Sequence, residues 1–243
     1  MTNSGAVLDL PGESWAGAFA LRDAAVLLRA TTPDPLVPLS DWEPHPTTFV
    51  ASTSALASWI RHGLDWDDPR RVGPRDRVVT FADLVRLRMI ALLRSRGIDY
   101  ARIQEAEAYA RELTHHPQPF VTEPMWTHSS DIFLAVQEHS IAATRAGQIA
   151  LPLLHEFLEP AHHRMEFGAD DVASIWRPEP RVSIDPRIRF GEPCINGTRV
   201  PTETIASLCS AGETAEGLAR LYGLTSSDVQ AALVWERRLE RAA

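Results

Sequence analysis

Apolar residues recur at helical spacing in four stretches of the first half of the chain. These stretches are residues 21–29, 54–62, 80–96 and 99–113. Apolar positions three and four residues apart share one face of an α-helix, so each stretch predicts an amphipathic helix. Thr53 is expected to cap the second helix, and Thr80 with Asp83 forms a capping box before the third, which Gly97 ends.

The C-terminal part begins with short alternating runs that predict strands. Residues 182–184 and 188–190 alternate apolar and polar side chains, and Asn196 with Gly197 follows. An Asn-Gly pair favours a tight turn because both residues tolerate a positive φ angle. This stretch therefore predicts a short β-hairpin.

Three closely spaced helices are predicted after the hairpin. Pro201 opens the first, Thr214 caps the second, and Thr225 with Asp228 forms a capping box for the third. Ala219, Gly223 and Val229 have the spacing of a helix-turn-helix. In that motif a small Ala lets the helices cross closely, a Gly makes the sharp turn, and an apolar Val fills the angle between the helices.

The pattern divides the chain into three predicted parts with seams near residues 113 and 178. These are a helical domain at 19–113, a connecting α/β segment at 114–178, and a helix-turn-helix module at 180–243. Pro33, Pro35, Pro38, Pro44 and Pro46 make 31–47 a loop without regular structure. The fold class is predicted to be mainly α with small β elements.

Residues 182–238 closely resemble domain-of-unknown-function family 433, whose hallmark is a run like IDPxIxFGxPxIxGTRxP before three helices. The matching positions here are Ile184, Asp185, Pro186, Phe190, Gly191, Pro193, Ile195, Gly197, Thr198, Arg199 and Pro201. Members of that family are typically antitoxin-like and accompany PIN-like ribonuclease toxins. The resemblance therefore implies an antitoxin similar to the VapB type of VapBC toxin–antitoxin systems, with a VapC-type ribonuclease as its partner.

Longer members of that family begin with a winged helix-turn-helix similar to MerR regulators. The order of two helices, a charged ribbon and two more helices fits that pattern, and residues 80–106 resemble MerR most. The loop at 31–47 departs from it, because it lengthens the turn between the first two helices. The resemblance implies an N-terminal MerR-like winged helix-turn-helix that binds operator DNA.

The distribution of charge suggests where DNA could bind. The net charge is −8 and all 24 basic residues are arginine, yet residues 61–96 hold nine Arg against five Asp. Clustered cations on one surface suit phosphate contacts. The residues expected to contact DNA are Ser54, Ser58, Arg61, Arg70, Arg71, Arg75 and Arg77. The alternative is that these arginines pair with neighbouring aspartates on an ordinary solvated face.

The C-terminal module is expected to contact protein rather than DNA. Residues 181–243 hold eight Arg and eight acidic residues, so the module lacks a net positive charge. PIN-like nucleases hold Mg²⁺ with carboxylates, and a guanidinium can satisfy such a site with two parallel hydrogen bonds. Arg187, Arg189 and Arg199 are the candidates. The alternative is that Arg199 braces the turn by pairing with Glu203 or Asp185.

Catalytic chemistry is not expected. The histidines at 115–163 lack the His-Glu-x-x-His spacing of a zinc protease, and there is no phosphate-binding glycine loop or nucleophile elbow. Cys194 and Cys209 form no Cys-x-x-Cys pair. We therefore expect no enzyme activity, metal or cofactor. No apolar run is long enough to span a membrane, and a reducing cytoplasm is expected.

The functional hypothesis is an antitoxin that neutralises a PIN-like ribonuclease and regulates its own operon by binding DNA. Residues 148–158 carry apolar side chains nearly all round a predicted helix, which suggests a homodimer or a deep position in the monomer core. The alternative function is a MerR-like, ligand-responsive transcriptional regulator without a toxin partner. The third hypothesis is a purely structural adaptor protein.

Overall fold

The computed structural model describes residues 17–32, 51–62, 78–95, 98–127 and 161–243. Within these ranges the protein is mainly α-helical with small antiparallel sheets, which confirms the predicted fold class. The predicted helix at 148–158, and with it the dimer hypothesis, lies outside the described residues, as does most of the loop at 31–47. No helix in the described ranges is long and apolar enough to cross a membrane.

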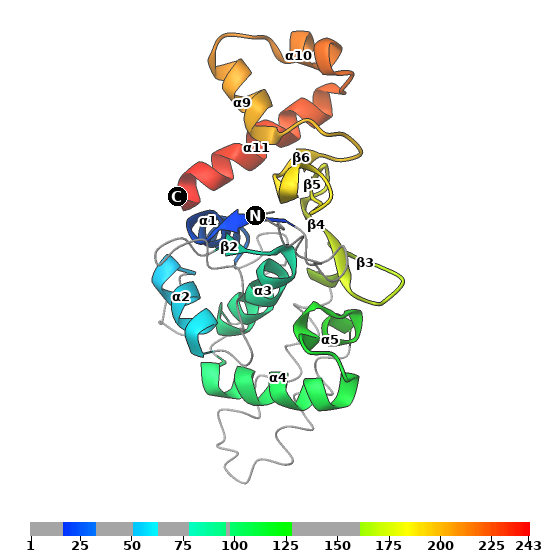
Figure 1. Cartoon of the computed structure of the whole chain (residues 1–243). Helices are drawn as coiled ribbons and strands as arrows, with labels where there is room; N and C mark the ends of the chain where they lie inside the picture. The colour runs from blue at the N-terminus through cyan, green and yellow to red at the C-terminus, as the bar shows by residue number, and fades with distance from the viewer. Residues whose placement is uncertain (1–16, 33–50, 63–77, 96–97, 128–160) are drawn as a thin grey trace, which may run out of the picture.

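Four helices and a two-stranded ribbon form the N-terminal body. They are β1 (Phe19–Ala20), α1 (Leu21–Thr31), α2 (Thr53–His62), β2 (Val78–Val79), α3 (Phe81–Ser95) and α4 (Tyr100–Thr114). β1 and β2 pair antiparallel. α3 runs through the middle of this body (Figure 1), and every side chain from 81 to 93 is buried. The four helices follow the predicted order, but β1 was not predicted, and most of the predicted charged ribbon lies outside the described residues. The likeness to MerR stays a prediction.

Most of the predicted helix ends are confirmed. Thr80 and Asp83 form the expected capping box, with backbone-to-side-chain distances of 2.9 and 3.2 Å. Asp99 caps α4 by accepting a hydrogen bond from the backbone N–H of Arg102. The cap of α2 was predicted one residue too late, because the Ser52 hydroxyl accepts from the N–H of Ala55 at 3.1 Å. Three hydroxyl residues in a row, at positions 52 to 54, left the choice of cap open to sequence reasoning.

A four-stranded antiparallel sheet lies beside this body. Its strands are β3 (Met165–Phe167), β4 (Ala173–Glu179), β5 (Val182–Ile184) and β6 (Cys194–Ile195), in that order. A short 3₁₀ turn, η2 (Pro119–Val121), and α5 (Glu123–Thr127) pack near it. The strand predicted at 188–190 is wrong, because β5 pairs instead with β6. Residues Arg189–Gly191 form a 3₁₀ turn, η3, between the two strands.

The C-terminal module consists of three helices, as predicted. They are α9 (Thr202–Ser210), α10 (Ala215–Tyr222) and α11 (Ser226–Ala242). Thr214 caps α10, Thr225 and Asp228 form the capping box of α11, and Gly223 ends α10 with a φ of 66°. Their apolar faces enclose a small core made of Ile195, Ile205, Leu218, Ala219, Val229 and Ala232. The three domain boundaries stay a prediction.

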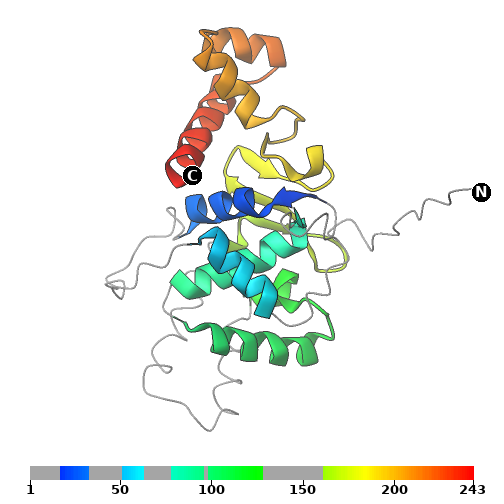
Figure 2. The same ribbon diagram turned by 60° about the vertical axis from the view of Figure 1, so that its left-hand side comes forward.

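Helix α11 belongs to both cores of the molecule. Val229 and Ala232 in its first half line the small core, whereas Trp235 is completely buried in the large core of the N-terminal body. The end of α11 lies against α1 (Figures 1 and 2). There the Arg29 side chain donates through Nε to the carbonyl of Ala242 at 2.5 Å and through Nη1 to that of Ala51 at 3.1 Å. One helix therefore ties the module to the body.

A second junction lies between η3 and the N-terminal strand. The N–H of Ala18 donates to the carbonyl of Phe190 at 3.0 Å. Gly191 has a φ of +91° and lies on the ring of Phe19, where an added Cβ would come within 2.4 Å of Cζ. Glycine is required here twice over, by its backbone conformation and by the close approach.

We expect Gly191→Ala to destabilise the protein more than Gly197→Ala does. Both glycines have a positive φ, and an added Cβ at Gly197 meets nothing within 4 Å. Each substitution costs about 1–2 kcal/mol in backbone strain. Only Gly191→Ala adds the clash with Phe19, about 1–3 kcal/mol more. Urea unfolding of the two variants measures this difference, and equal stabilities would show that η3 does not pack on Phe19.

Candidate functional site

The outer face of α2 carries three of the residues predicted to contact DNA. Ser54 and Arg61 are exposed and Ser58 is half-buried. Their positions, four and three residues apart, place them along one side of the helix, while Leu56, Trp59 and Ile60 are buried on the other. The structure therefore brings these three together. Arg70, Arg71, Arg75 and Arg77 lie outside the described residues.

The arginines of α3 do not form the positive surface that the sequence suggested. Arg86 is buried and pairs with the buried Glu107 through both carboxylate oxygens, at 2.5 and 2.8 Å. The guanidinium of Arg88 is also buried, and its Cζ lies 4.6 Å from the ring centroid of Trp176. Counting charge along the segment overestimated the exposed cations, because α3 is enclosed on all sides. The apolar residues all round α3 were the missed signal.

The three arginines expected to contact the toxin differ in their pairing. Arg187 makes two hydrogen bonds from its guanidinium to the carboxylate of Asp185, both at 2.9 Å. Arg189 donates through Nε to Glu192 at 2.5 Å. Among the described residues, the exposed side chain of Arg199 has no such partner. The alternative in which Arg199 braces the turn by pairing with Glu203 or Asp185 is not found among the described residues, where Asp185 is held by Arg187.

Charged groups surround the thiol of Cys194 on β6. Burial raises the pKa of this thiol to about 11, and Glu192 adds to the rise, while Arg189 and Arg199 oppose it. Both arginines are therefore close enough to act on one buried atom. A thiol with this pKa stays protonated at neutral pH and is a weak nucleophile.

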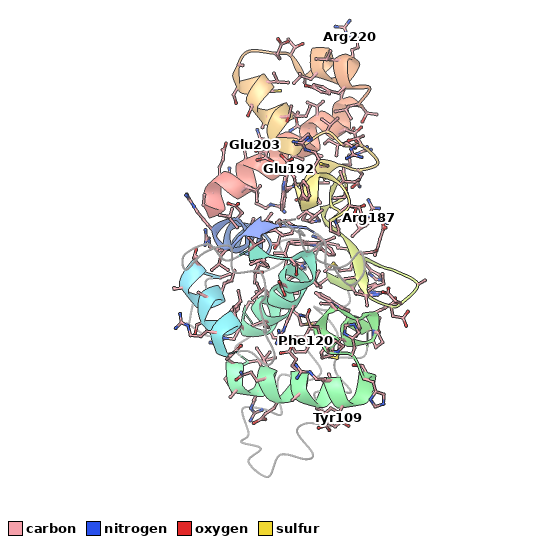
Figure 3. The ribbon with its side chains drawn as sticks, in the orientation of Figure 1. Tyr109, Phe120, Arg187, Glu192, Glu203 and Arg220 are labelled. Carbon is pink, nitrogen blue, oxygen red and sulfur yellow. The ribbon has the colours of Figure 1, made fainter. Side chains whose placement is uncertain are left out.

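A group of glutamates beside these arginines was missed by the sequence analysis. The hydroxyl of Thr202, the first residue of α9, lies 2.5 Å from Oε1 of Glu236 on α11. Burial raises the pKa of Glu236, and the charges of Glu203, Glu240 and Glu192 raise it further. Glu192 and Glu203 lie close together at the base of the module (Figure 3). These residues are far apart in sequence, so no local pattern could group them.

The helix-turn-helix of the module has little positive charge on its second helix. Ser226, Ser227 and Gln230 are exposed on the first half of α11, which has no basic residue before Arg237. Asp228 is held by Thr225, whose hydroxyl lowers the pKa of the carboxyl, and by Arg181 at 2.7 Å. This surface suits protein contact better than phosphate contact.

Metal-ligating side chains do not converge in the described part of the chain. No group of three or more His, Cys, Asp or Glu residues there could hold a metal ion. His162 lies 3.2 Å from Glu123 and stacks on Phe167, with 5.4 Å between ring centroids. His128, His139 and His155 lie outside the described residues.

We expect Glu236→Gln to stabilise the protein at neutral pH. A carboxyl whose pKa is raised in the folded state favours folding only while it is protonated, and this benefit is lost as the pH rises through the folded pKa. At pH 7, above the ordinary glutamate value, the raised pKa of Glu236 therefore counts against folding, and glutamine removes the ionisable group. The gain should shrink as the pH falls and vanish below about 4.5, the ordinary glutamate value. Thermal unfolding between pH 4 and 8 measures it.

Glu105→Gln is the matched control, because Glu105 is exposed on α4 and loses the same charge. If both variants show the same pH dependence, the environment of Glu236 is not the cause.

The C-terminal module matches a family model of unknown function, and two individual proteins are similar to most of the chain. Residues 182–235 match the family described as protein of unknown function, DUF433. The uncharacterized protein Rv2308 of Mycobacterium tuberculosis is 27% identical over 199 residues, which are 76% of this chain and 84% of that protein. The crystal structure of Rv2018 from Mycobacterium tuberculosis superposes with a TM-score of 0.66 at 19% identity, over 88% of this chain and 96% of that one. The chain therefore carries a DUF433 match in residues 182–235 and shares its overall fold with Rv2018.

Proposed function

We propose that this protein is an antitoxin-like regulator. Its C-terminal module would bind and neutralise a PIN-like ribonuclease of the VapC type, and its N-terminal body would bind the operator DNA of its own operon. The observation that carries the proposal is the loop between β5 and α9, which displays Arg187, Arg189 and Arg199 on a firmly held module. The DUF433 match covers this loop, and the antitoxin role is what this chain's resemblance to that family implies.

Arg199 is the residue best prepared to enter an anionic nuclease site. Its guanidinium has no ion pair to break among the described residues, whereas Arg187 and Arg189 would first have to release Asp185 and Glu192. Releasing these partners carries a cost that Arg199 does not have, although solvent screening keeps it small for exposed pairs. The planar fork of an unpaired arginine can instead satisfy the carboxylates that hold the catalytic metal.

The face of α2 would make the DNA contacts. Ser54 and Ser58 can donate to phosphate oxygens, and Arg61 can reach either a phosphate or a guanine edge. A homodimer would present two copies of this helix to the two halves of a palindromic operator.

We expect Arg199→Ala to release the activity of the nuclease. The proposal expects a PIN-like ribonuclease to be encoded in the same operon, and the test uses that protein in purified form, with cleavage of a fluorescent RNA as the measurement. Wild-type protein should inhibit cleavage, and Arg199→Ala should weaken inhibition at least tenfold, because one bidentate contact to a carboxylate is lost. Arg220→Ala is the control, since Arg220 is also exposed but lies at the tip of the module on α10 (Figure 3).

Failure of wild-type protein to bind or inhibit the nuclease would overturn the proposal. If wild-type protein inhibits, and Arg187→Ala, Arg189→Ala and Arg199→Ala inhibit equally well, the toxin contact must lie outside this loop. If the protein has no nuclease partner and binds its promoter DNA only in the presence of a small ligand, the alternative function, a ligand-responsive regulator, is correct.

A further inference from the structure

Phe190 is the most exposed large apolar residue in the described part of the chain. Its side chain is 75% accessible to solvent, against 72% for Leu221 and 38% for Val234. Its backbone has a φ of 58°, and its neighbour Arg189 has a φ of 48°. Left-handed conformations are rare and strained for bulky residues. The turn is therefore strained, and it holds the aromatic ring of Phe190 away from the core.

The backbone under this ring is held firmly. The carbonyl of Phe190 accepts a hydrogen bond from the N–H of Ala18, and the N–H of Gly191 donates to the carbonyl of Ile188 at 2.9 Å. Gly191 also lies directly on the ring of Phe19. A side chain on such a rigid support loses little conformational entropy when a partner covers it, so burial of its ring translates efficiently into affinity.

Arginines lie on both sides of Phe190 in the chain. The side chains of Arg187 and Arg189 are 46% and 48% exposed, and Arg199 is exposed as well. Aromatic rings and arginines together are the residue types that dominate binding energy at protein interfaces. The complementary surface has an apolar pocket for the ring and a carboxylate for the guanidinium of Arg199, which has no charged partner among the described residues.

We propose that Phe190 is the apolar anchor by which this protein docks on the ribonuclease, in a pocket beside the carboxylates that hold the catalytic metal. This inference rests on the proposed function and adds to it the residue that supplies the nonpolar part of the contact. In this contact Arg199 supplies the positive charge and Phe190 supplies the buried apolar surface. An exposed ring of this size buries most of its surface when it binds in a pocket.

A single-stranded nucleic acid could also stack on an exposed phenylalanine. The charges favour a protein instead. Arg187 is neutralised by Asp185 and Arg189 by Glu192, which leaves Arg199 as the one member of the three without a charged partner among the described residues. Binding a phosphate chain relies on a net positive surface, which this loop does not provide.

Phe190→Asn is the decisive variant, because asparagine removes the ring and tolerates a positive φ better than phenylalanine does. Leu221→Gln is its control, since it removes an equally exposed apolar side chain from α10. Affinity for the same purified ribonuclease is measured by calorimetry. Phe190→Asn should raise Kd at least tenfold, as expected for an anchor residue, while Leu221→Gln leaves it within about twofold. The melting temperature of Phe190→Asn should not fall.

Unchanged affinity in Phe190→Asn, with wild-type protein binding tightly, would overturn this inference and leave the proposed function standing. Absence of wild-type binding would overturn both. If Phe190→Asn lowers the melting temperature, Phe190→Gly takes its place, since glycine fits the same φ. A labelled oligouridine is titrated in parallel, and loss of RNA binding with unchanged nuclease binding would assign Phe190 to nucleic acid instead.

Discussion

Sharing of α11 between two hydrophobic cores is the constraint on which the rest of the structure depends. The helix is 17 residues long, and its first half completes a core too small to be stable alone. Its second half buries Trp235 among residues of the N-terminal body, and Arg29 fixes its end. The C-terminal module is therefore attached firmly to the N-terminal body, and its surface keeps a fixed orientation relative to that body.

The turn at Arg189–Gly191 is the second support, and it gives a physical meaning to part of the DUF433 motif. Gly191 is needed because no side chain fits against Phe19. Asp185 is needed because its carboxylate accepts from both the backbone and the guanidinium of Arg187. These two residues maintain the loop. Phe190 and Arg199 are different, since their side chains are exposed and do not hold the loop together. Our proposal is that these two residues make the contact with the partner.

Local features of the fold could be predicted from the sequence, and long-range ones could not. The capping boxes at Thr80 and Thr225 depend on residues three positions apart, and both are present. The strand at 188–190 was wrong because alternation alone does not reveal a left-handed turn. The burial of Arg86 and Arg88 depends on Glu107 and Trp176, which only the folded chain brings near.

The candidate site divides in the same way. The residue types at 187, 189 and 199 pointed to this loop, and the exposed face of α2 followed from helical periodicity. The carboxylates of Asp185 and Glu192 pair with Arg187 and Arg189, which leaves Arg199 without a charged partner among the described residues. This pairing could be seen only in the folded structure. The exposure of Phe190 was hidden for another reason, because an apolar residue in an alternating run is expected to face the core.

Hydrogen exchange in increasing urea tests most directly whether the module and the body form one unit. Peptides from the first half of α11, its second half and α3 can be followed in the same mass-spectrometric experiment. The shared helix predicts that all three lose protection at the same urea concentration, in one cooperative transition. Loss of protection in the first half of α11 at lower urea, while α3 stays protected, would contradict the account and separate the binding module from the body that supports it.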